Sequence, residues 1–238
     1  MTEAEWLTGT NPSPMLELLW SKVTDRKWRL FACACCRRLE PLITDERGRA
    51  ALVTAEEFAD GLTERRALIS RKIDAEMVGL EDMVGLEDVG NDCEAWMANQ
   101  MCAHAAGGDT GQVGGAANSA IELRSYYAAR IRPTNPQGTD SITWQAAETE
   151  ERLQQAILLR DVFGNPFRPA SFSPEWRTDT AVLLARGMYE SREFSAMPIL
   201  ADALQDAGCD DSDILDHCRG EGPHVRGCWV VDLVLGKE

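Results

Sequence analysis

Apolar residues recur at intervals of three and four along most of the chain, which is the spacing of one buried face of an α-helix. The segment between Thr24 and Pro41 shows this pattern most clearly. Its apolar stripe consists of Trp28, Phe31, Cys35 and Leu39. No segment sustains the alternation of apolar and polar residues, bounded by hairpin turns, that is typical of β-strands. The pattern therefore predicts an all-α protein.

Residues typical of helix ends divide the chain into separate helices. Thr2 and Glu5 match a capping box, a Ser-Pro pair at 13–14 marks a second start, and Gly164 provides a stop. Further helices are predicted at 24–40, 44–61, 63–77, 92–108, 121–132, 142–163, 175–194, 197–208 and 210–219. The last segment, 223–236, fits a helix or a strand, and its apolar spacing favours a helix. The face that this helix would bring together consists of Val225, Cys228, Trp229, Asp232 and Leu235.

Four segments interrupt the helical pattern. The glycine-rich stretch 107–120 predicts a flexible loop between helices, and 132–141 has the composition of a turn-rich linker. Prolines make 165–174 extended. The tandem hexapeptide MVGLED at 77–88 is too short for a solenoid repeat and indicates a local duplication that lengthens a loop or helix. We expect one domain over 1–238, a multi-helix orthogonal bundle, with the linker as the candidate point of subdivision.

The charge of the chain restricts its partners and its compartment. Among 238 residues, 39 are acidic and 24 are basic, which gives a net charge of −15. Such a surface repels phosphate backbones, so it disfavours nucleic acid and suits a basic protein partner. No stretch reaches the roughly 20 apolar residues of a membrane helix, and the first residues do not resemble a signal peptide. We therefore expect a cytoplasmic protein with eight reduced cysteines.

Most motifs for catalysis are incomplete. The glycine-rich stretch lacks the lysine and the preceding strand of a phosphate-binding loop, and no GxSxG nucleophile motif is present. Cys33, Cys35 and Cys36 form CxCC rather than the CxxC of thiol–disulfide enzymes, which favours packing between helices over redox chemistry. Acidic residues at 210–216 beside His217 could serve a divalent ion or a general base, although helix starts commonly carry acids.

One group of potential metal ligands lies near the C-terminus. His217, Cys218, His224 and Cys228 provide nitrogen and sulfur donors, and the intervening turn RGEGP could bring them together. Against a zinc site, neighbouring residues on a helix point about 100° apart, and the group has no CxxC spacing. The competing interpretation places the histidines at helix ends and Cys228 in the core. The sequence leaves both open.

Four segments have a distinctive wording: MTEAEWL, DRKWRLFACACCRR, LLRDVFGNPFRP and the C-terminal stretch ILADALQDAGC to DLVLGKE. In these segments the chain resembles an uncharacterised, highly paralogous bacterial protein family. Together they cover about half of the chain and exclude its middle. The resemblance brings no catalytic residues with it, so it implies no mechanism. Families of this kind often serve as interaction modules, which is an analogy only.

The leading functional prediction is a non-catalytic, cytosolic helical scaffold that binds another protein. Arg168, Arg226 and Trp229 are the candidate contact residues, because interfaces are rich in arginine and tryptophan. The alternative for these residues is a structural role, with guanidinium groups bonded to the last carbonyls of helices. Two other classes remain: a metalloprotein that binds zinc through the C-terminal group, and a hydrolase or transferase whose pocket the sequence does not reveal.

Overall fold

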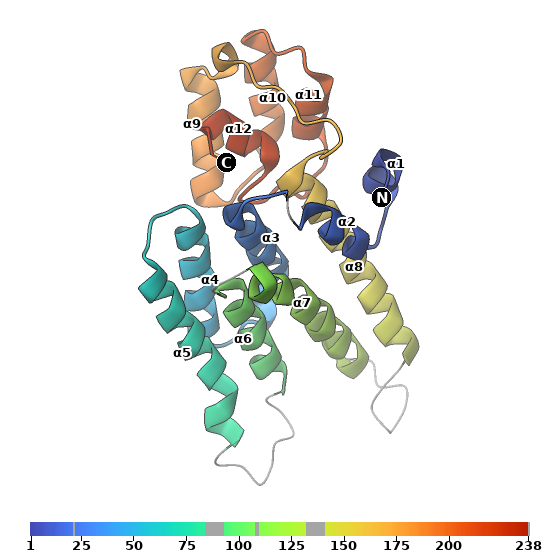
Figure 1. Cartoon of the computed structure of the whole chain (residues 1–238), viewed down its shortest axis with the longest axis vertical. Helices are drawn as coiled ribbons and strands as arrows, with labels where there is room; N and C mark the ends of the chain where they lie inside the picture. The colour runs from blue at the N-terminus through green and yellow to red at the C-terminus, as the bar shows by residue number, and fades with distance from the viewer. Residues whose placement is uncertain (21, 84–92, 108–109, 132–140, 238) are drawn as a thin grey trace. The chain divides into compact units, whose positions relative to one another are not determined.

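The computed structural model describes residues 1–20, 22–83, 93–107, 110–131 and 141–237 (Figure 1). Every regular element in these ranges is a helix, so the predicted all-α fold is confirmed. The α-helices are α1 (Glu3–Thr8), α2 (Pro12–Leu19), α3 (Asp25–Arg38), α4 (Glu46–Ala59), α5 (Arg65–Met83), α6 (Cys93–Ala105), α7 (Thr110–Ile131), α8 (Ser141–Phe163), α9 (Asp179–Ser191), α10 (Met197–Asp206), α11 (Ser212–Arg219) and α12 (Trp229–Leu235). Short 3₁₀ helices cover Glu40–Leu42 and Pro174–Trp176. No described helix combines the length and the apolar character needed to cross a membrane.

The helices form two compact units. The first contains Met1–Lys22 and Ala156–Glu238, and the second contains Val23–Gln155. The chain passes from one unit to the other near the start and again within α8. Of the linker predicted at 132–141, residues 132–140 lie outside the described residues, and the division between the units falls elsewhere.

The second unit is built around α3, which packs against α4, α6 and α7. Nine consecutive residues of this helix, from Trp28 to Cys36, are buried, so the helix is enclosed on every side. The single apolar stripe predicted from the sequence was too narrow. Even Arg29 is buried, and its guanidinium donates to the carbonyls of Ala105 and Gly107, both at 2.8 Å.

The cysteines of α3 fill space in this core. Cys33, Cys35 and Cys36 are buried, and burial raises the pKa of each thiol well above its ordinary value. A protonated, inaccessible thiol is a poor nucleophile. All the cysteines whose side chains the structure describes are free thiols. This arrangement agrees with the packing role expected for the CxCC motif.

Most of the described part of the glycine-rich stretch is helical. From Thr110 onward it forms the first turns of α7, which packs against α6. A β-carbon on Gly115 would lie 3.3 Å from the ring of His104, so the small residue allows the two helices to approach closely. The prediction was wrong because glycine serves helix contact here as well as chain flexibility. Residues 108–109 lie outside the described part of the chain.

The first unit contains α1, α2, the end of α8 and α9–α12, and residues of α9–α12 and the segments beside them form an apolar core. Thr2 and Glu5 form the predicted capping box. Helix α2 begins earlier than predicted, at Pro12, because the Asn11 side chain caps it by accepting from the Ser13 amide. The expected extended segment 165–174 carries no regular element until the 3₁₀ turn at Pro174.

The C-terminal segment is helical, as its spacing predicted, but only from Trp229 onward. Its buried face is formed by Val230, Val231, Asp232 and Val234. Val225 precedes the helix, and Leu235 is only partly buried, so the predicted face was wrong at these positions. The shorter helix leaves Cys228 as its N-cap residue, at the end of a loop that returns from α11. This position determines where the Cys228 thiol lies.

Candidate metal centre

Four side chains of the first unit converge on one point. Asp161 comes from the last turns of α8, His217 from the last turn of α11, His224 from the following loop, and Cys228 from the N-cap of α12. One ligand atom from each of the four residues lies within 4.8 Å of every other. Three of these residues belong to the predicted C-terminal group, and the fourth is 56 positions earlier in the sequence than His217.

The distances within the group suit a small metal ion. The His217 Nε2 atom lies 3.1 Å from the Cys228 Sγ atom and 3.2 Å from the Asp161 Oδ1 atom. The His224 Nδ1 atom lies 2.8 Å from the same oxygen. Ligands of a tetrahedral zinc ion are separated by about 3.3–3.8 Å, given bonds of roughly 2.0–2.3 Å. Small movements of these side chains would therefore place all four around one ion.

Helix α11 separates the two neighbouring residues of the predicted group. Asp211 caps this helix by accepting from the amides of Asp213 and Ile214. On the helix, His217 points to the convergence point, whereas Cys218 is fully buried in the apolar core. Burial raises the pKa of the Cys218 thiol to about 12. Cys218 is therefore not part of the group, as the divergence of adjacent helical side chains leads one to expect.

The loop between α11 and α12 is fixed to Asp161 by its backbone. The Val225 amide donates to the Asp161 Oδ2 atom at 2.9 Å, so both oxygens of this carboxylate have partners. Gly222 has a φ of +81°, a left-handed conformation that glycine adopts without strain. This turn brings His224 back toward α8. Asp161 thus positions the loop as well as contributing an oxygen donor.

The group is shielded from solvent. The exposed fractions of the Asp161, His217 and His224 side chains are 3%, 17% and 8%, and Cys228 is fully buried. The His224 Nε2 atom is buried and has no hydrogen-bond partner among the described residues. The only polar contact of this ring is therefore the one that it makes inside the group, through Nδ1.

The surroundings shift the pKa values of the two acidic members, Asp161 and Cys228, in opposite directions. Burial alone would raise the pKa of Asp161, but hydrogen bonds with His217 and His224 outweigh it and lower the pKa. Burial raises the pKa of the Cys228 thiol well above its ordinary value, and the nearby Asp161 carboxylate raises it further. Without a cation the thiol therefore stays protonated. A bound metal ion would supply the positive charge that a thiolate needs here.

The same geometry argues against a Cys–His–Asp catalytic triad. In a triad the two nitrogens of the histidine face different groups, one the nucleophile and the other the acid. Here the Cys228 sulfur and the Asp161 oxygen both face the Nε2 atom of His217. The fully buried thiol also offers no access to a substrate. Convergence of donors on one point is the arrangement of a metal site.

A pocket of about 410 Å³ opens beside this group and includes His217 in its wall. Its other walls are mostly apolar and aromatic, with Trp6, Phe163 and Trp229 among them, and Asp213 and Asp216 stand at its polar side. No serine, threonine or cysteine is among its lining residues. The pocket therefore lacks the nucleophile that a hydrolase of the serine or cysteine type would require.

The three predicted contact residues make contacts within the first unit. The Arg168 Nε atom donates to Glu3 at 2.5 Å, the Arg226 guanidinium lies 4.7 Å from the centre of the Tyr189 ring, and the Trp229 ring lies 5.1 Å from that of His217.

Two other arginines make the kind of contact with helix-end carbonyls that was considered for Arg168 and Arg226. Arg177 donates to the carbonyls of Leu233 and Val234 at the end of α12. Arg160 donates to the carbonyls of Trp6 and Gly9 at the end of α1.

Comparison with models of known protein families, with curated proteins and with solved structures finds no match to this chain. The assignment of the centre therefore rests on its geometry and donor chemistry.

Proposed function

We propose that the first unit binds one zinc ion through Asp161, His217, His224 and Cys228 and depends on this ion for its folded structure. The observation that carries the proposal is the convergence of four donor atoms within 4.8 Å of one another. The ion would connect α8, α11, the following loop and α12, which are separate in sequence. Structural zinc sites contribute directly to folding free energy in this way.

The donor set favours zinc over other metals. Two imidazoles, one thiolate and one carboxylate suit a borderline-soft ion, whereas calcium and magnesium require oxygen donors. A two-histidine, one-carboxylate iron site would need open coordination positions. Cys228 would take the fourth position, and the burial of the group leaves little room for others. Four protein ligands complete the tetrahedron that zinc prefers.

A set of four protein ligands also supports a structural role for the zinc ion rather than a catalytic one. A catalytic zinc ion retains one position for water or substrate, with three protein ligands. Here all four donors come from side chains, and only His217 is noticeably exposed, at 17%. The pocket of about 410 Å³ includes His217 alone among the four ligands, whereas a second pocket of about 210 Å³ is lined by Asp161, His217 and His224, and Cys228 lines neither.

A competition titration tests the proposal. Protein purified without a histidine tag is stripped with a chelator, and zinc is returned against a chromophoric chelator. We expect one site per chain in the parent protein and strongly weakened binding in Cys228→Ala and His217→Ala. Cys218→Ala is the matched control, because it removes the neighbouring thiol outside the group and should leave zinc affinity unchanged. Equal affinity in all four proteins would contradict the proposal.

We also propose that this zinc-stabilised chain acts in the cytoplasm as a scaffold for a basic protein partner. Free, buried cysteines fit a reducing compartment, and the net charge of −15 fits a basic partner. Rapid alkylation of thiols in intact cells, followed by mass spectrometry of the denatured protein, measures whether the cysteines are reduced, as a reducing compartment requires. Eight thiols that carry no disulfide are expected, and a disulfide in freshly trapped protein would contradict it.

A further inference from the structure

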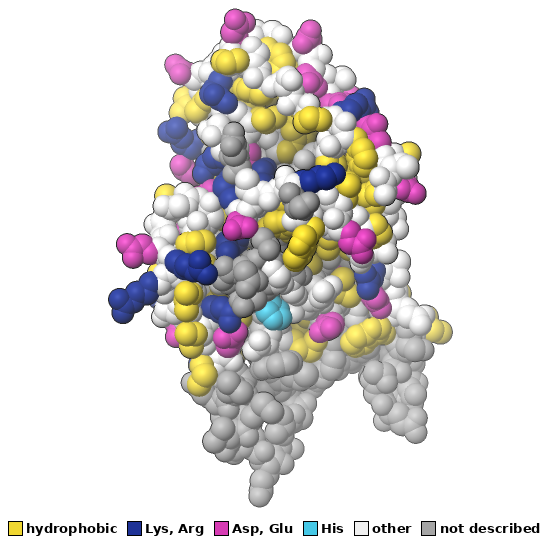
Figure 2. Space-filling view, in the orientation of Figure 1, with side chains coloured by type: hydrophobic (Ala, Val, Ile, Leu, Met, Phe, Trp, Pro, Cys, Tyr) yellow, Lys and Arg dark blue, Asp and Glu magenta, His cyan; other side chains and the backbone are white. Residues whose placement is uncertain are grey.

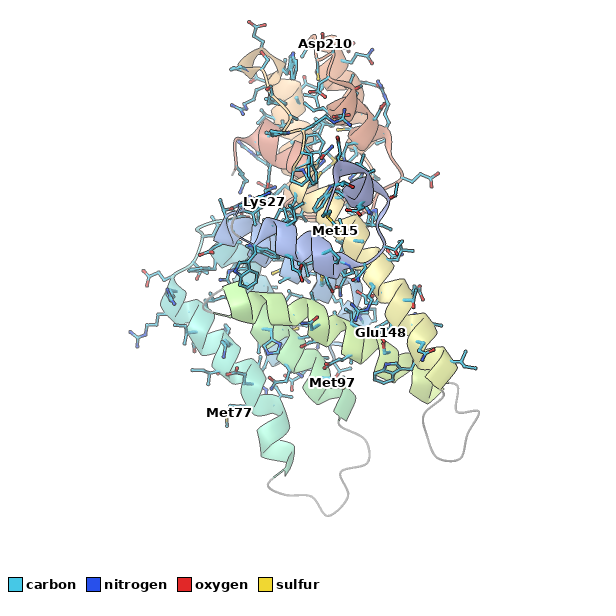
Figure 3. All side chains as sticks on the ribbon, turned by 45° about the vertical axis from the view of Figure 1, so that its right-hand side comes forward. Met15, Lys27, Met77, Met97, Glu148 and Asp210 are labelled. Carbon is cyan, nitrogen blue, oxygen red and sulfur yellow. The ribbon has the colours of Figure 1, made fainter. Side chains whose placement is uncertain are left out.

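Helix α5, in the second unit, carries an exposed apolar stripe. Ile69, Ile73 and Met77 are exposed by 40%, 51% and 41%. They are spaced by four residues, so they follow one another along a single face of the helix. Met77 projects from the outer side of α5, away from α6 (Figure 3). Figure 2 shows hydrophobic side chains in a row over α5. The opposite face, with Leu68 and Ala75, is buried against the rest of the unit.

The charges of α5 are segregated along its length. From Arg65 to Lys72 the helix has four basic residues and no acidic one, and from Ile73 to Met83 it has four acidic residues and no basic one. This order is the opposite of what a single helix favours, because the helix dipole attracts acids to the N-terminus and bases to the C-terminus. The first turn has no acidic residue and the last turn no basic one. Within the helix, Arg71 pairs with Asp74 and Lys72 with Glu76. The outer charges, two arginines at the start and two acids at the end, are therefore the ones that the isolated helix does not explain.

We propose that α5 pairs with α5 of a second copy of this chain, antiparallel and related by a two-fold axis near Ile73. In that register the basic half of each helix faces the acidic half of the other. The two helix dipoles also point in opposite directions. Ile69 of one copy comes level with Met77 of the partner subunit. Arg66 comes level with positions 80–81 of the partner helix, where Glu81 stands. Self-complementary patches of this kind are what a two-fold dimer requires.

The contact area sets the strength of the expected association. The helix has 19 residues, which corresponds to a length of about 28 Å. Two such helices bury a small interface, so the dimer is weak, depends on protein concentration, and weakens in high salt because charge pairs contribute to it. The proposal does not rest on the zinc centre, which lies in the other unit.

Sedimentation velocity of the full chain over a range of concentrations tests this proposal. We expect a monomer–dimer equilibrium at low salt that shifts toward monomer at high salt. Ile73→Glu should abolish the dimer, whereas Leu183→Glu, the same kind of change at a 67% exposed position on α9, should leave it intact. A monomer at every concentration, or an equal effect of the two variants, would overturn the proposal.

Charge reversal tests the antiparallel arrangement separately and changes only polar positions. Arg66→Glu and Glu81→Arg should each weaken the dimer, and the double variant should restore it. Failure of the double variant to restore association, while circular dichroism shows it folded, would overturn the register. Cys228→Ala should dimerise like the parent protein, so loss of the zinc centre and loss of the dimer are distinguishable results.

Discussion

Asp161 is the residue on which both the centre and its surroundings depend. Its Oδ1 atom faces His217 and His224, and its Oδ2 atom accepts from the Val225 amide. A buried carboxylate is stable only when such partners compensate for the loss of water. With a zinc ion bound, the same oxygen would become a ligand, so removal of its charge should affect metal affinity and folding together.

Asp161→Asn is the most specific change at this position, since it keeps the shape of the side chain and removes the negative charge. Loss of an outer-shell partner lowers metal affinity about 10–100-fold, and loss of a ligand should cost more. We expect such a reduction in the chelator competition, and also a lower unfolding free energy of the zinc-loaded protein. Asp213→Asn, an exposed acid on α11, is the control. Equal zinc affinity of the two variants would contradict the role of Asp161.

His104 should make the unfolding free energy of the second unit depend on pH. Burial, and then the positive charge of Lys72, lowers the pKa of this imidazole. The unfolded chain protonates it below about pH 6.5, whereas the folded chain keeps it neutral to a lower pH. The unfolded state therefore binds more protons in this window, so the unfolding free energy decreases as the pH falls through it.

Urea unfolding of the parent protein and of His104→Gln, at a pH above this window and at a pH within it, measures this effect. The loss of stability on acidification should be smaller in the variant, because glutamine does not titrate. The same pH dependence in both proteins would show that His104 does not contribute. The remaining pH dependence of both proteins comes from other groups and cancels in the comparison.

At the residue scale the sequence was sufficient to propose three of the four residues in the candidate metal centre. His217, His224 and Cys228 could be proposed because they are close together in the chain. Asp161 could not, since no local pattern shows that a residue 56 positions earlier meets them. Its one signal was an acidic residue inside an apolar run, next to the buried Leu158, Leu159 and Val162. An unpaired acid in such a position needs a partner, but the sequence does not name it.

At the scale of elements, capping residues and apolar spacing predicted nearly every helix, because these signals are local. Thr2 and Thr24 cap the helices that begin where the sequence predicted. Helix α9 instead begins at Asp179, after its N-cap Thr178, and not at 175. The error in the glycine-rich stretch had a tertiary cause. Small residues there meet α6, and His104 hydrogen-bonds to Ser119 of α7 at 3.0 Å. The sequence does not distinguish a glycine kept for contact from one kept for flexibility.

Two glycines within helices should respond to substitution in opposite directions. Gly115→Leu forces a side chain against the His104 ring and should lower the unfolding free energy by about 1–3 kcal/mol. Around Gly187 in α9 an added β-carbon would meet nothing within 4 Å. Gly187→Ala should therefore raise stability by about 0.5–1 kcal/mol. Chemical denaturation of both variants checks the prediction, and destabilisation by Gly187→Ala would contradict the description of α9.

At the scale of the whole molecule, the described residues form two compact units, and the proposed metal centre lies in the first. A bound metal stabilises the part of a protein that holds its ligands. The sequence predicted one bundle over the whole chain. It gave no indication that the N-terminal helices α1 and α2 cluster with the C-terminal residues, because that depends on long-range packing.

Removal of zinc should therefore act unevenly along the chain. After chelation, amide hydrogen exchange should accelerate in α11, the 220–228 loop and α12, while protection in α3, α4 and α6 stays nearly unchanged. Hydrogen exchange read by mass spectrometry resolves these segments. Equal acceleration throughout both units would show that the ion does not stabilise the first unit selectively.

X-ray absorption at the zinc edge identifies the ligand atoms of the bound ion. The zinc-loaded protein should show one sulfur at about 2.3 Å and three nitrogen or oxygen neighbours at about 2.0–2.2 Å. In Cys228→Ala the sulfur contribution should disappear. A shell of oxygen and nitrogen only in the parent protein, or a shell with several sulfurs, would contradict a centre formed by Asp161, His217, His224 and Cys228.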